Sequence, residues 1–287
     1  MTTPNMGGPT VRRILVGAQM RRLREAADIT REDAAYVIRG SGSKISRMEL
    51  GKVSFKERDI VDLLQHYGVT DEEQREAIVN LARDANAPGW WHNYDDVLPQ
   101  WFETYVGLEA AASLIRTYEV QFIPGLLQTE DYARAVTIAG QPALAADEIE
   151  RRVNLRSTRQ ELLTRSNAAR LWAVVDEGAL RRPIGGSRVM RAQLEHLLEL
   201  REIKNITIQI MPFRFGGHAA EGGAFSILRF PEPELPDVVF VEQLVSALYL
   251  DKREQVDRYG QIFDRLTVDS QPPDLSAEAL KRIISRG

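Results

Sequence analysis

The chain has 287 residues, of which 44% are hydrophobic, 27% charged and 7% aromatic. This composition indicates a globular protein of roughly two domains and excludes collagen-like, mucin-like and wholly disordered classes. The chain contains no cysteine, which excludes disulfides, cysteine-bound metals and thiol catalysis. No apolar run approaches the ~20 residues that span a bilayer, and the first ten residues lack the core of a signal peptide. We therefore expect a cytoplasmic protein without a membrane partner.

Charge is distributed unevenly along the chain. The 37 basic and 41 acidic residues give a net charge of −4. Residues 11–58 hold 12 basic and 6 acidic residues, a net of +6, so the rest of the chain holds 25 and 35, a net of −10. We expect the basic segment to meet a polyanion while the remainder repels it.

The first 86 residues predict a lead-in followed by a helical domain. Residues 1–10 are rich in Gly, Pro, Thr and Asn and are expected to be disordered. An apolar stripe predicts a helix over 11–27, after which Asp28 is suited to a left-handed turn. Thr30 and Asp33 form a weak capping box for the next helix. The helices expected in this domain, residues 11–86, cover 11–27, 30–38, 43–50, 57–67 and 71–84.

A stretch rich in Pro, Gly and aromatic residues from residue 86 predicts the domain boundary. We expect an α+β regulatory and dimerisation domain over 87–270, with a small, mostly antiparallel sheet. Residues 271–287 are predicted to form a linker and a C-terminal helix over 276–285. Helices are predicted at 102–118, 130–139, 147–165, 187–201 and 252–266, and strands at 171–175, 206–210, 224–228 and 238–242. Ile206, Ile208 and Ile210 should point inward, with Thr207 and Gln209 outward.

Two short helices joined by a tight, Gly-containing turn form the pattern of a helix-turn-helix. The segments ITREDAAYVI (29–38) and SGSKISRMELG (41–51) resemble the helix-turn-helix of the Xre and phage-repressor family over residues 11–70. The resemblance implies that Arg31 binds a DNA phosphate and that Gly42, Ser43 and Arg47 face bases. Arginine can pair bidentately with guanine. The DNA-binding residues predicted for double-stranded DNA are Arg31, Ser41, Gly42, Ser43, Lys44, Ser46, Arg47 and Lys52.

The rest of the chain is similar to a second family. The segments GWW (89–91), WFETYVGLE (101–109), YEVQFIPGLLQTEDYARA (118–135) and LWAVVDEGALRR (171–182) resemble the C-terminal domain of actinobacterial antitoxin-like transcriptional regulators. The resemblance implies a partner, a very small protein encoded by a neighbouring gene, and a role in developmental or antibiotic regulation.

The residue patterns of common enzymes are absent from the sequence. The four histidines are scattered without metal-ligand spacing, and neither a serine-nucleophile motif nor a phosphate-loop motif is present. The pairs Asp95–Asp96 and Asp176–Glu177 are expected to be solvated. We therefore expect no catalytic residue, no bound metal and no cofactor.

Two groups of residues leave alternatives open. Aromatic residues crowd the boundary and predict either packing where the domains join or a ligand or partner site; the candidates are Trp90, Trp91, Tyr94, Trp101 and Tyr105. Arg152, Arg156 and Arg159 share one helical face, which predicts a solvated, salt-bridged surface or a second polyanion contact.

These observations predict a sequence-specific, DNA-binding transcriptional regulator associated with the nucleoid. We expect a homodimer whose C-terminal domain responds to a small protein partner. Two alternatives remain: the same DNA-binding protein controlled by a small apolar ligand, or an antitoxin-like protein that holds a partner without binding DNA.

Overall fold

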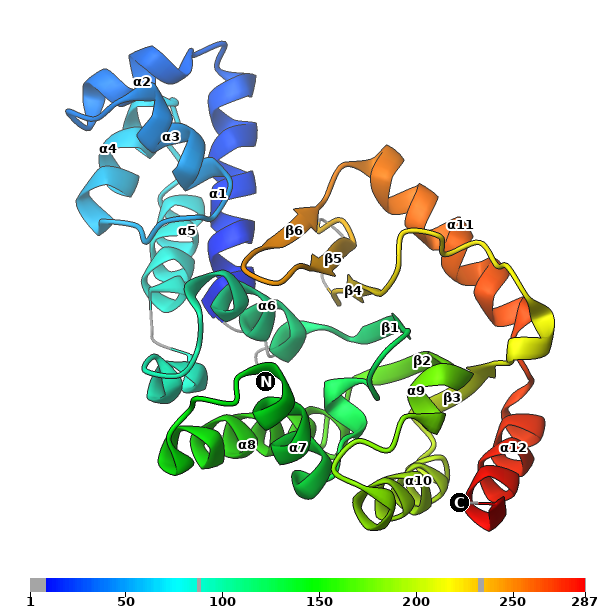
Figure 1. The fold of residues 1–287 in the computed structure, drawn as a ribbon. Coiled ribbons are helices and arrows are strands. Elements are labelled where there is room, and N and C mark those ends of the chain that lie inside the picture. The colour runs from blue at the N-terminus through cyan, green and yellow to red at the C-terminus, as the bar shows by residue number, and fades with distance from the viewer. Residues whose placement is uncertain (1–8, 87–88, 232–234, 287) are drawn as a thin grey trace. The chain divides into compact units, whose positions relative to one another are not determined.

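The structure is a computed structural model that describes residues 9–86, 89–231 and 235–286. Its contacts divide the chain into two compact units, Met1–Asn93 and Tyr94–Gly287, which we call the N-terminal and C-terminal units (Figure 1). Across these described residues, no helix has the length and apolar character needed to cross a membrane.

The N-terminal unit is helical, as predicted. Helix α1 begins at Pro9, so the predicted lead-in is wrong for its last two residues, while its residues 1–8 lie outside the described residues. The helices are α1 (Pro9–Ala26), α2 (Arg31–Val37), α3 (Gly42–Glu49), α4 (Glu57–His66) and α5 (Glu72–Ala85), followed by the 3₁₀ turn η1 (Trp90–Tyr94).

The turns of this unit confirm the predicted caps. Asp28 adopts the left-handed conformation, with φ of 55°. The Thr30 hydroxyl accepts a hydrogen bond from the Asp33 N–H at 3.1 Å and donates to the Asp33 carboxylate at 2.7 Å. Gly51 ends the turn after α3 with φ of 64°, and a Cβ there would lie 2.7 Å from the Ile14 nitrogen. The sequence therefore determines where α2 starts and where α3 stops.

A single core holds α1 to α5 together. Helix α1 crosses α3 closely, since a Cβ on Gly17 would lie 2.5 Å from the Met48 carbonyl oxygen. Ala27, the last residue of the helix predicted over 11–27, lies beyond the end of α1 and is exposed. The expected core side chains Val16, Met20, Ala34, Ala35, Ile38, Ile45 and Met48 are buried, while Leu23 and Ile29, also expected there, are partly buried against them.

The C-terminal unit combines a sheet with helices. Its helices are α6 (Gln100–Ala111), α7 (Glu130–Gly140), α8 (Ala146–Gln160), α9 (Glu177–Arg181), α10 (Ser187–Leu200), α11 (Arg253–Asp269) and α12 (Pro273–Arg286), with 3₁₀ turns η2 (Gly125–Leu127), η3 (Glu161–Leu163) and η4 (Phe213–Phe215). Its strands are β1 (Leu114–Glu119), β2 (Arg170–Asp176), β3 (Ile206–Met211), β4 (Phe225–Arg229), β5 (Val238–Glu242) and β6 (Ala247–Leu250).

The predicted small, mostly antiparallel sheet is wrong. The sheet is mixed and has six strands in the order β3-β2-β1-β4-β5-β6. The pairs β1–β2 and β2–β3 are parallel, and the other three pairs are antiparallel. The parallel half follows from the helices that separate β1, β2 and β3 along the chain, because a parallel pair requires a long crossover connection (Figure 1).

Both faces of the parallel half are covered, which explains a second correction. Gln209 was predicted to point to solvent, but it is buried. Its side-chain oxygen accepts from the indole N–H of Trp172 at 2.7 Å, and its amide donates to the carbonyl oxygens of Thr267 and Gln271 at 3.1 Å each. The face opposite the three inward isoleucines therefore packs against α11 rather than water.

Two predicted segments differ from the structure, and two strands were not predicted. The helix expected over 102–118 ends at Ala111, and the following residues form β1, a strand that the sequence analysis missed together with β6. The predicted linker at the start of 271–287 is wrong, because the Gln271 N–H donates to the Ile210 carbonyl at 2.9 Å and α12 follows at once.

The predicted arginine face of α8 is not a solvated surface. Arg159 is buried and donates two hydrogen bonds to the carboxylate of Glu109, at 2.7 and 2.8 Å. Arg156 donates to the Ala133 carbonyl at 3.3 Å, and only Arg152 makes the expected pair with Glu148. Arg159 therefore fastens α8 to α6 and is not available to a polyanion.

Candidate nucleic-acid interface

Helix α3 presents a short polar face beside the turn that leads into it. Ser43 and Arg47 are exposed on this helix, and Gly42 is its half-buried first residue. Ser41 is the N-cap, and its side-chain oxygen accepts from the Lys44 N–H at 3.2 Å. Ser41 was predicted as a DNA contact, and its hydroxyl is also a structural cap.

The predicted cations differ in how they are held. Arg47 and Lys52 are exposed, and neither has an acidic partner within residues 9–86. Lys44 instead donates to the carboxylate of Asp59 at 2.6 Å, and that carboxylate is almost fully buried. An ion pair of this kind fixes the direction of the lysine side chain and offsets its charge.

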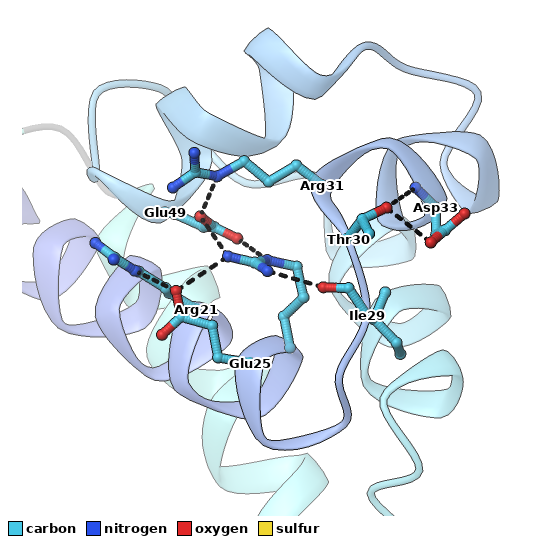
Figure 2. A network of polar contacts seen from close by, with 8 residues as sticks. Arg21, Glu25, Ile29, Thr30, Arg31, Asp33 and Glu49 are labelled. Atoms are coloured by element: carbon cyan, nitrogen blue, oxygen red, sulfur yellow. Dashed lines mark hydrogen bonds and ion pairs between the residues drawn. The ribbon is translucent and has the colours of Figure 1, made fainter.

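Arg31 is also tied to a buried acid. Its Nε donates to Glu49 at 3.0 Å, while its side chain remains 42% exposed. The same carboxylate accepts from Arg24, whose NH1 donates to the Ile29 carbonyl at 2.8 Å (Figure 2). The buried Arg24–Glu49 pair therefore joins α1 to α3 and holds the guanidinium of Arg31 at the start of α2.

The electrostatics of this network follow from its hydrogen bonds. The hydrogen bond to Glu49 raises the pKa of Arg24, so its guanidinium stays charged. Burial, aided by the charge of Glu49, raises the pKa of Tyr67 to about 12. The charged guanidinium of Arg24 is therefore held beside Glu49, and Arg31 donates to the same side chain.

The sequence analysis missed residues on both sides of this interface. The buried pair of Glu49 and Arg24 was not predicted. The available signal was Glu49 itself, an acidic residue inside a strongly basic segment. Arg39, in the turn before α3, and Lys56, the N-cap of α4, are exposed and have no acidic partner in the described part of the N-terminal unit. Their positions in the loops that flank α3 make them further candidates for phosphate contacts.

The boundary aromatics are divided between the two units. Trp90 and Trp91 belong to the N-terminal unit, where the Trp91 ring is buried. Tyr94, Trp101 and Tyr105 belong to the C-terminal unit.

The three aromatics of the C-terminal unit pack within it. The Tyr105 ring lies 4.1 Å from that of Phe240 between centroids, and the Trp101 carbonyl accepts from the Tyr249 hydroxyl at 2.6 Å. The Tyr94 ring lies under the Arg151 guanidinium, with 5.4 Å between them.

The fold and this surface define a helix-turn-helix protein with an α+β C-terminal unit, and comparison with known families gives the same division. A helix-turn-helix domain matches residues 15–77. A domain of unknown function, DUF5753, matches residues 102–282, more than half of the chain, and the protein belongs to this family. No curated protein and no solved structure matches the chain.

Proposed function

We propose that the protein is a transcriptional regulator that binds double-stranded DNA in a sequence-specific manner through α3. The observation that carries this proposal is the helix-turn-helix domain at residues 15–77. Its helix α3 exposes Ser43 and Arg47, while the buried side chains of Ile45 and Met48 fix the helix to the core. A helix presented in this way enters the major groove and contacts base edges. We propose no catalytic role.

The test is a comparison of operator and random duplexes. Sites are first mapped by genome-wide footprinting, and affinities are then measured by gel shift at fixed salt. Arg47→Ala should weaken operator binding by about 1–3 kcal/mol and leave random-duplex binding nearly unchanged. Arg75→Ala, which removes the same charge from α5, is the matched control. An equal loss on both duplexes would show that Arg47 contacts phosphate, and no operator at all would refute the proposal.

Arg31 should behave differently from Arg47. A phosphate contact carries no sequence information, so Arg31→Ala should weaken both duplexes alike and reduce the salt slope by about one unit. A loss confined to the operator would assign Arg31 to base contact instead.

We also propose that the protein acts as a homodimer on two half-sites about 34–36 Å apart. Support comes from β6, an edge strand that pairs only with β5 among the described strands. The hairpin at this edge exposes Leu244 completely, Val245 at 83% and Leu248 at 53%. Antiparallel pairing of two copies of β6 would be two-fold symmetric and would cover these side chains. Leu244→Asp should lower the dimer fraction in analytical ultracentrifugation, and a wild-type monomer would refute the proposal.

The C-terminal unit is proposed to receive the regulatory input. The resemblance to antitoxin-like regulators suggests a small protein from a neighbouring gene as the partner. The C-terminal unit, residues 94–287, holds 23 basic and 28 acidic residues, and this net charge of −5 disfavours its contact with DNA and suits a protein or small-molecule input. Co-expression with the neighbouring small protein, followed by native mass spectrometry, tests this; a chain that never forms the complex would refute this partner.

A further inference from the structure

A cavity of about 360 Å³ lies in the C-terminal unit. It is lined by α9, which follows β2, by the segment after β3, and by α12. The carboxyl ends of parallel strands are where open α/β sheets commonly bind ligands. Its volume falls in the range of about 300–1,000 Å³ that is typical of small-molecule sites.

The lining of this cavity is positively charged. It holds three arginines, Arg181, Arg214 and Arg282, and one acid, Glu177. Glu177 is fully engaged: one carboxylate oxygen accepts from Arg181 at 2.7 Å, and the other accepts from the Phe213 N–H at 2.9 Å. The positive charge of the lining therefore exceeds its negative charge by two.

Two of these arginines are available to a ligand. Arg214 is exposed and has no acidic partner within the described part of the chain. Arg282 lies 3.8 Å from Glu278, and both side chains are more than half exposed, so water screens this pair. A guanidinium presents a planar set of donors that fits a carboxylate or a phosphate.

The cavity also offers apolar surface and an unsatisfied acceptor. The ring of Phe213 is 59% exposed at its wall, beside apolar residues of β3 and α12. The side-chain oxygen of Gln271 is buried without a donor, although this residue lines the cavity. A buried acceptor without a partner costs free energy unless a ligand or water supplies a donor.

We propose that this cavity binds a small organic anion: an acidic head group held by Arg214 and Arg282, an apolar body against Phe213, and a hydroxyl or amine donor that reaches Gln271. The proposal concerns the C-terminal unit alone and does not depend on DNA binding. It assigns a specific site to the family's domain of unknown function.

Titration calorimetry of the full chain, without DNA, tests the site. Phenyl phosphate and benzoate carry the two candidate head groups on one apolar ring, and benzyl alcohol is the neutral control. At least one anion should bind with one-to-one stoichiometry at millimolar concentration, and the better one identifies the head group. Binding by neither anion, or equal binding of the alcohol, would overturn the proposal.

Substitutions then locate the binding. Arg214→Gln combined with Arg282→Gln should weaken binding by about tenfold or more, whereas Arg258→Gln, an exposed arginine on α11, should not. Ala279→Phe, which fills the cavity without changing its charge, should also abolish binding. Because Arg214 and Arg282 are exposed, the double variant should keep the wild-type circular dichroism spectrum. Unchanged affinity in the folded double variant would place the anion elsewhere.

Discussion

Replacing Glu49 by glutamine should strongly destabilise the N-terminal unit. The Glu49 side chain is 3% exposed, and that of its partner Arg24 is 8% exposed. Glutamine keeps the shape and one acceptor oxygen, but it removes the negative charge and leaves the buried guanidinium of Arg24 with Glu25, a half-exposed side chain 3.3 Å away, as its acidic partner. Breaking one side of a buried ion pair costs about 3–5 kcal/mol. Because one acceptor remains, we expect the low end, about 3 kcal/mol.

Hydrogen exchange of the full chain measures this loss without contributions from the C-terminal unit. Amides of α1 and α3 should lose about two orders of magnitude of protection in Glu49→Gln, since 1.4 kcal/mol corresponds to about tenfold. The matched control is Asp62→Asn, which removes an acid 3.8 Å from Arg58 where both side chains are exposed. Exposed pairs contribute only about 0–1 kcal/mol, so this control should exchange almost as the wild type does.

A second variant separates the lost charge from lost packing. Changing Arg24 to Met and Glu49 to Leu removes both charges, and apolar replacement of a buried pair is commonly neutral or stabilising. The double variant should therefore recover most of the protection. Two results would contradict this reasoning: a loss of less than about 1 kcal/mol in the free energy of unfolding for Glu49→Gln, or a double variant less stable than Glu49→Gln.

Three further outcomes are expected. Asp59→Asn should lower thermal stability by about 1–3 kcal/mol, because it weakens the charge-assisted hydrogen bond from Lys44 to a buried acceptor. Gly17→Ala should destabilise α1 against α3 by about 1–3 kcal/mol in urea titrations, because the new Cβ collides with the Met48 carbonyl. Burial, aided by a nearby carboxylate, raises the pKa of Glu119 from 4.5 to about 8. Between these two pKa values the folded state binds more protons than the unfolded state, so the free energy of unfolding should fall as the pH rises from about 4.5 to about 8. Thermal melts at each pH should show this decline in the wild type and a smaller decline in Glu119→Gln. An unchanged slope in the variant would contradict this prediction.

Local patterns predicted the N-terminal unit well because its helices are ended by residues with specific backbone roles. Thr30 caps α2, Asp28 adopts positive φ, and Gly51 stops α3, each as expected from its own chemistry. The predicted caps and core therefore needed no information from distant parts of the chain. The buried ion pair did need it, because Arg24 and Glu49 are 25 residues apart and spacing alone does not pair them.

The sheet was harder to predict because its pairing is set by residues far apart in sequence. Strand β1 pairs with β2 and β4, and its segment LIRTYE, which includes the charged residues Arg116 and Glu119, was predicted as the end of a helix. Gln209 lies at an alternating position that suggests solvent, yet α11 covers it. Such burial depends on which helix lies over each face, and period-two alternation carries no information about that. The alternation of helices and strands from β1 to β3 was the better guide, because it predicts parallel pairing.

The predicted DNA contacts are of two kinds: cations that are paired with the buried acids Glu49 and Asp59, and cations that are not. Arg31 and Lys44 each donate to a nearly buried carboxylate, so their side chains have one direction and reduced net charge. Such groups lose little conformational entropy on binding but contribute less attraction to a phosphate. Arg47 has no partner of this kind in the described part of the unit, so it keeps its full charge and its rotamer freedom. Phosphate contacts set the register and base contacts select the sequence, so the anchored cations are suited to positioning α3 and Arg47 to recognition.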